Sequence, residues 1–77
     1  MTKLRLVTYR ELSKVAEKTG FKWVRSEGSH NTFRNAAGSI IVMPDHGSRV
    51  IVRPLLRKLL RDMGLNAEDY NRKLEEL

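Results

Sequence analysis

Three short segments typical of β-strands lie between residues 21 and 43, and they constrain the fold more than any other feature of the chain. Residues 21–27 (FKWVRSE) mix aromatic and β-branched residues with charges, and the segments HNTFRN and SIIVM flank an Ala-Ala-Gly turn. We expect Gly38 to adopt the positive φ of this turn and Pro44 to end the ladder. The pattern predicts an antiparallel three-stranded sheet in which residues 30–43 form a hairpin.

An amphipathic segment precedes the predicted sheet. Thr8 and Glu11 have the spacing of a capping box, in which each side chain accepts a hydrogen bond from the backbone N–H of the other residue. Apolar residues then recur at helical spacing until Gly20, which suits the left-handed conformation after a helix. A helix of about three turns is therefore expected to begin at Thr8.

A second amphipathic segment follows the sheet, after a surface loop of turn-forming residues at 44–49. Pro54 and Gly64 bound a predicted helix over residues 54–63, because proline is favoured at the start of a helix and glycine just beyond its end. The leucines of this segment predict a buried stripe. Asn66 is suited to capping a short final helix.

The order of these segments predicts an α+β fold of the type α-β-β-β-α with a short C-terminal helix. Two helices on one face of an antiparallel sheet make a two-layer sandwich whose other face is exposed. The same layout occurs in double-stranded-RNA-binding domains, although a shared layout does not by itself establish a function. We expect residues 1–77 to form a single domain.

The chain combines small size with a strong positive charge. A domain of 77 residues buries only about 60% of the surface of its unfolded chain, so any site should be shallow. Fifteen Lys and Arg against nine Asp and Glu give a net charge of +6, which favours a nucleic-acid partner but also serves solubility alone. The absence of cysteine excludes a disulfide scaffold and thiol catalysis. No apolar run in the sequence is long enough to cross a membrane, so we expect a cytoplasmic protein.

His30 is the residue best suited to catalysis. Histidine as a residue type has an ordinary pKa of about 6.5, which allows proton transfer near neutral pH. If the nucleic-acid partner is RNA, its 2′-hydroxyl provides the nucleophile, so cleavage needs no metal ion. Strand alternation places His30 and Arg34 on one face and Phe33 on the other, so a buried Phe33 would leave His30 facing solvent. Judged from the residues alone, a histidine at the start of a strand is more often structural than catalytic.

Several short motifs in a fixed order resemble the HicA family of toxins, which are small RNA-cleaving proteins of bacterial and archaeal toxin–antitoxin pairs. The resemblance rests on Gly20-Phe21, on VRSEGSHNTF at 24–33, on MPDHG at 43–47 and on LLRKLLRDMGL at 55–65. It implies a fold similar to the double-stranded-RNA-binding domain and ribonuclease activity on mRNA, with His30 as the catalytic residue. It also implies a HicB-type antitoxin that binds and blocks the toxin.

Basic and polar residues provide candidates for RNA binding. Arg25 and Arg34 flank the histidine in sequence and suit the stabilisation of negative charge at phosphorus. Gly28 and Ser29 either allow the RNA backbone to approach or serve only the turn, and His46 is either a second RNA-contacting group or a loop histidine. Four further candidates lie on the second predicted helix or directly before it, where almost no glutamate at i−4 offers a partner, so we expect an unpaired stripe: Arg53, Arg57, Lys58 and Arg61.

Two functions of different classes remain open from the sequence. The first is a metal-independent mRNA endoribonuclease in which His30 transfers the proton and basic side chains hold the phosphates. The second is a non-catalytic module that binds double-stranded RNA by shape and phosphate contacts. A weaker third is an interaction subunit whose basic surface only meets an acidic antitoxin. No metal or cofactor is expected, because His30, His46 and Asp45 lack the ligand spacing of a metal site.

Overall fold

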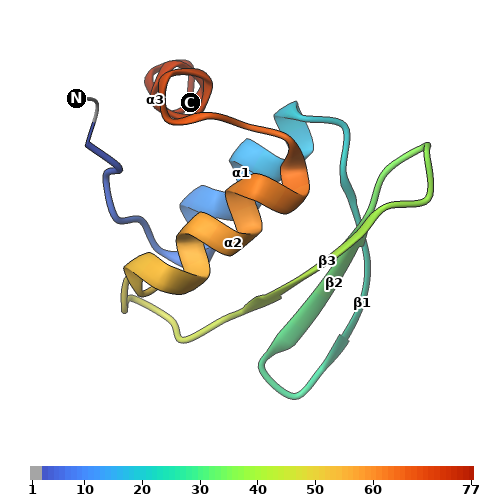
Figure 1. Ribbon diagram of the computed structural model, residues 1–77. Coiled ribbons are helices and arrows are strands. Elements are labelled where there is room, and N and C mark those ends of the chain that lie inside the picture. Colours follow the sequence, from blue (N-terminus) through green and yellow to red (C-terminus); the bar gives the residue numbers. More distant parts are fainter. Residues whose placement is uncertain (1–2) are drawn as a thin grey trace.

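The computed structural model describes residues 3–77, and its elements follow the order α-β-β-β-α-α (Figure 1). A three-stranded antiparallel sheet carries its helices on one side, which confirms the predicted α+β fold of the double-stranded-RNA-binding type. No helix in this part of the chain is long and apolar enough to span a membrane. The elements are α1 (Tyr9–Lys18), β1 (Lys22–Glu27), β2 (His30–Arg34), β3 (Ile40–Pro44), α2 (Arg53–Met63) and α3 (Ala67–Glu75).

The capping box predicted at the start of α1 is present. The Thr8 amide donates to Glu11 Oε1 over 3.1 Å, and the Glu11 amide donates to Thr8 Oγ1 over 3.4 Å. The apolar stripe of the helix is buried, and Gly20 follows the helix with a φ of 97°. The helix therefore begins at Tyr9, one residue after the predicted start, with Thr8 as its N-cap, and it stops before Gly20 as predicted.

Two tight hairpins connect the strands, which lie in the order β1-β2-β3 across the sheet. Gly28 and Ser29 make up the whole first loop, since Glu27 pairs with His30. The φ of 59° at Gly28 fits the first central position of a type II′ turn, where glycine is favoured. In the second loop, Gly38 has the predicted positive φ, 90°.

A β-bulge in β1 determines which of its side chains lie on which face of the sheet. Trp23 pairs with Phe33 and Arg25 pairs with Thr32, so Val24 is an extra residue with no partner on β2. Strict alternation would place Trp23 and Val24 on opposite faces. Because both are apolar, alternation alone cannot decide which face of this strand points to the core. The bulge keeps Trp23 on the face of Phe33 and moves Arg25 to the opposite face.

One face of the sheet is covered by α1 and α2, and the other face is open (Figure 1). α2 contacts β3, while α1 contacts β3 and α3. On the covered face, Phe33, Ile41 and Met43 are at most 2% exposed. Burial of this face fixes the strand register, because a slip of one residue would turn all of these side chains to solvent.

α2 begins one residue earlier than predicted, at Arg53 rather than Pro54. Val52 has the extended dihedral angles of an N-cap residue, which places Pro54 at the second helical position. The missing N–H of proline costs nothing there, because the first four amides of a helix have no partner within it. Gly64 ends the helix with a φ of 77°, as predicted.

α3 and the segment before α1 hold each other in place. Asn66 caps α3 as predicted, accepting the Asp69 amide over 2.8 Å. The Tyr70 hydroxyl donates to the carbonyl oxygen of Arg5 over 2.5 Å, and Asn71 hydrogen-bonds the same segment. Tyr70 is fully buried, and this burial raises the pKa of its hydroxyl to about 12. The segment before α1 is therefore part of the packed domain.

Replacing Tyr70→Phe should remove a pH-dependent part of the stability. The folded state holds the hydroxyl proton more tightly than the unfolded chain, where the pKa is 10.0. The resulting stabilisation is fully present below the unfolded pKa and is lost as the pH rises towards about 12. Urea unfolding across this alkaline range should show a steeper decline for the wild type than for the variant. Parallel declines would contradict the assignment.

Candidate functional site

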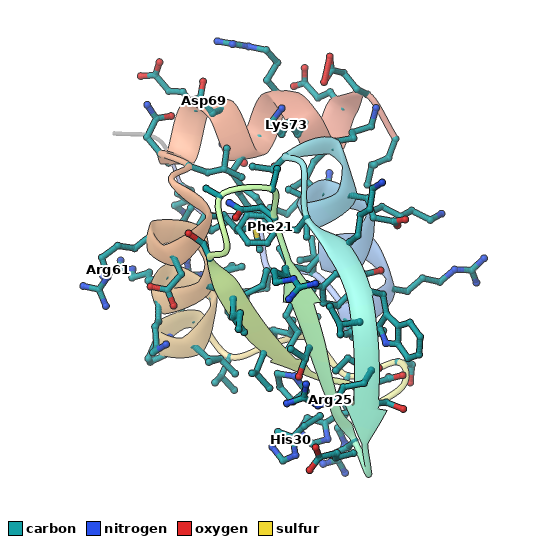
Figure 2. The ribbon with its side chains drawn as sticks, turned by 90° about the vertical axis from the view of Figure 1, so that its right-hand side faces the viewer. Phe21, Arg25, His30, Arg61, Asp69 and Lys73 are labelled. Carbon is teal, nitrogen blue, oxygen red and sulfur yellow. The ribbon has the colours of Figure 1, made fainter. Side chains whose placement is uncertain are left out.

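His30 is the first residue of β2 and lies on the open face of the sheet (Figure 2). Its side chain is exposed, whereas Phe33 on the covered face is 2% exposed, as strand alternation predicts. Arg34 shares the face of His30 and is also exposed. Thr32 lies between them but is only 9% exposed, because β2 is the central strand and has a neighbour on each side.

The bulge brings Arg25 to the face of His30. In a regular strand, Arg25 would follow Trp23 onto the covered face, but here it pairs with Thr32. Figure 2 shows Arg25 and His30 at the same end of the sheet. Arg25 Nε lies 3.2 Å from Glu27 Oε1, yet both side chains are mostly exposed, and such pairs contribute at most about 1 kcal/mol. Arg25 can therefore exchange this carboxylate for another anion at little cost.

The loop after β3 is tied to the turn that precedes His30. The carbonyl oxygen of Ser29 accepts the Asp45 amide over 2.7 Å, and His30 pairs with Pro44. His46 follows two residues after Pro44, so its backbone lies in the same region, and its side chain is exposed. The structure thus brings the Gly-Ser turn, both histidines and Arg25 to one end of the sheet.

Asn31 supports this end of the sheet, although the sequence analysis did not single it out. Its Oδ1 accepts the Trp23 Nε1–H over 3.0 Å, and its Nδ2 donates to the carbonyl oxygen of Ser29 over 3.4 Å. Asn31 is only 9% exposed. The signal that could have found it is a polar residue on the covered face, where it needs a hydrogen-bond partner.

The prediction of an unpaired basic stripe on α2 was wrong for Lys58, which has an acidic partner. Lys58 Nζ lies 2.9 Å from Asp62 Oδ2, because its acidic partner comes four residues after it rather than before it. Arg53 Nη1 donates to the carbonyl oxygen of Leu4 over 3.0 Å, a contact between segments far apart in sequence. Both side chains are nevertheless exposed.

Arg57 and Arg61 form a separate group from the residues around His30. They line a hollow of about 310 Å³ between α2 and the segment before α1. Figure 2 shows Arg61 on α2 at the side of the molecule, whereas His30 lies at the end of the sheet. Arg34 is also distant from His30, since four residues of a strand span about 13 Å. The structure therefore distributes the predicted basic residues over three regions.

The His30 end of the sheet combines groups for proton transfer and for anion binding. An exposed imidazole can accept or donate a proton, and the neighbouring guanidinium of Arg25 can stabilise negative charge. Within residues 3–77, no group of three or more His, Asp or Glu side chains is placed to hold a metal ion. These side chains are open to solvent, so a large polyanion can reach them.

A comparison with protein families covers α1, the three strands and α2 but not α3. The model of the family described as HicA toxin of bacterial toxin-antitoxin matches residues 9–65, from the start of α1 to the residue after Gly64. The chain belongs to the HicA toxin family. No curated protein matches its sequence. The match contains the whole sheet and His30, which confirms the resemblance seen in the motifs, and HicA membership implies that the protein is paired with an antitoxin.

Replacing Asn31→Ala should lower the free energy of unfolding by about 1 kcal/mol, because two hydrogen bonds of the hairpin are lost. Trp23 is the only tryptophan, so loss of its partner should also shift its fluorescence emission. Asn35→Ala is a matched control, since Asn35 Oδ1 accepts the Ser39 amide in the other hairpin. The control should reduce stability without shifting the emission. Equal emission from both variants would contradict the Trp23–Asn31 contact.

Proposed function

We propose that residues 1–77 form a single RNA-cleaving domain, a metal-independent endoribonuclease that acts on mRNA with His30 as general acid–base. The observation that carries this proposal is the exposed His30 on the open face, with Arg25 brought to the same face by the bulge. Membership of the HicA toxin family supports the role of a toxin.

The proposed reaction uses the nucleophile that RNA provides. His30 accepts the proton of a 2′-hydroxyl while the 2′-oxygen forms a bond to the adjacent phosphorus. The bond from phosphorus to the 5′-oxygen breaks, and this oxygen takes a proton from His46 or from water. The products are a 2′,3′-cyclic phosphate and a 5′-hydroxyl. Acid–base catalysis of this kind contributes about 10² to 10⁴-fold in rate.

In this proposal, other residues stabilise the negative charge of the reacting phosphate and allow the RNA to reach His30. Arg25 stabilises the additional negative charge that develops on the phosphoryl oxygens. Gly28 and Ser29 present a turn with little side-chain bulk, which allows the RNA backbone to approach His30. Arg57 and Arg61 offer phosphate contacts on a second surface, and Arg53 and Lys58 add positive charge beside them.

The proposed partners are mRNA and a HicB-type antitoxin, which we expect to meet the toxin in the cytoplasm. The antitoxin would bind and block the toxin, as the family resemblance implies. A net charge of +6 supports association with RNA, because Lys and Arg side chains displace the counterions of the phosphates. The same charge also supports association with an acidic surface of an antitoxin.

The His30→Ala variant tests the proposal. Wild type and variant are incubated with a long single-stranded RNA in excess EDTA, and the ends of the fragments are mapped. We expect cleavage by the wild type with cyclic phosphate ends, and a loss of at least about 100-fold in the variant. The variant should melt at the wild-type temperature, because the His30 side chain is exposed.

His46→Ala is the control for a general effect of removing an imidazole. It should retain more activity than His30→Ala, because water can replace its proposed role as proton donor. Normal cleavage by His30→Ala would falsify the proposal. RNA that stays intact with the wild type but is retarded on a gel would instead identify a non-catalytic RNA-binding module.

A further inference from the structure

The molecule has a hollow beside the end of β2 that is opposite to His30. It measures about 420 Å³ at the edge of the sheet and is lined by Gly20, by Lys22, Trp23 and Val24 of β1, by Arg34 at the end of β2 and by the loop after it. Lys22 and Arg34 contribute its basic groups, and the bulge residue Val24 contributes an apolar one. This space is large enough for part of a nucleotide, since ligand pockets begin at about 300 Å³.

Lys22 and Arg34 lie directly opposite each other on β1 and β2. Like charges in directly opposed positions destabilise an antiparallel sheet. Within residues 3–77, neither side chain takes part in an ion pair, whereas Arg25 on the same strand pairs with Glu27. An anion placed between the two cations would remove their repulsion, so this pairing is better explained by binding than by stability.

We propose that this hollow binds a phosphate of the same RNA strand whose scissile phosphate reaches His30. The inference rests on the proposed function for the identity of the ligand. RNA is favoured over an acidic protein because His30 and Arg34 are the first and last residues of one strand, and strand alternation places both on the same face. A single polyanionic strand with regularly spaced charges can occupy both.

The spacing of the two sites predicts a dependence on RNA length. His30 and Arg34 are separated by about 13 Å along β2, which corresponds to about four nucleotides of a stacked strand at about 3.4 Å each. A dinucleoside monophosphate carries only one phosphate and therefore cannot fill both sites. The hollow should contribute to the binding of longer RNA and not to the cleavage of such a minimal substrate.

Binding is measured with the combined substitutions Lys22→Gln and Arg34→Gln in a protein that also carries His30→Ala, so that the RNA stays intact. The probe is a fluorescein-labelled single-stranded RNA of about 12 nucleotides, followed by anisotropy between about 50 and 200 mM salt. We expect weaker binding by the variant. The slope of log K against log[salt] should also be shallower by about 0.7, the value for one phosphate of a single strand. The combined variant should melt no lower than its parent, because the removed charges repel each other.

Lys3→Gln with Lys14→Gln is the matched control, since both lysines are exposed and lie outside β1 and β2. This control removes the same charge and should keep the parent's salt slope. Unchanged RNA binding by the Lys22 and Arg34 variant would overturn the inference, as would an equal loss in the control. Loss of antitoxin binding with unchanged RNA binding would overturn it too, and would assign the hollow to a protein contact.

The failure of this inference is distinguishable from failure of the proposed function. In the His30-containing background, the Lys22 and Arg34 variant should cleave a dinucleoside monophosphate at the wild-type rate and a long RNA with a raised KM. Equal KM values for long RNA in an active nuclease would overturn only the inference. An inactive wild type whose RNA binding still depends on Lys22 and Arg34 would overturn only the proposed cleavage.

Discussion

Burial of one face of the sheet beneath α1 and α2 is the interaction on which the rest of the structure depends. The side chains of Phe33, Ile41 and Met43 are almost completely removed from water, and each buried side chain of this size contributes about 1.5 to 3 kcal/mol before entropy is subtracted. Because neighbouring residues of a strand point to opposite faces, this burial forces His30 and Arg34 to the open face. The packing that stabilises the domain therefore also exposes its basic and titratable groups.

Features governed by neighbouring residues were predictable from the sequence. The capping box of Thr8 and Glu11, the positive φ of Gly38 and the helix stop at Gly64 all depend on interactions within one turn of the chain. The exposure of His30 followed from the period of two in a strand. The start of α2 was displaced by only one residue, since proline is accepted at either of the first two helical positions.

Features governed by distant residues were not predictable in the same way. The bulge at Val24 depends on how β1 aligns with β2, and its consequence is that Arg25 lies on the face of His30. The hydrogen bond from the Asp45 amide to Ser29 joins residues 16 positions apart, and Arg53 reaches Leu4 across 49. Nearness in sequence also overstated how close Arg34 lies to His30, because four residues span about 13 Å in a strand but only about 6 Å in a helix.

Departures from the rules of stable sheets are concentrated on or beside the open face. The bulge at Val24 interrupts the ladder, Lys22 opposes Arg34, and two apolar residues of the edge strand β3 are exposed, with Ile40 at 58% and Val42 at 44%. On β2 and β3 the covered face shows regular burial, and its one buried asparagine has its hydrogen bonds, whereas Trp23 on the edge strand β1 is 54% exposed. A protein selected only for stability would show no such asymmetry, because each departure costs free energy without improving the packing. This asymmetry supports the proposal that the open face of the sheet binds a partner.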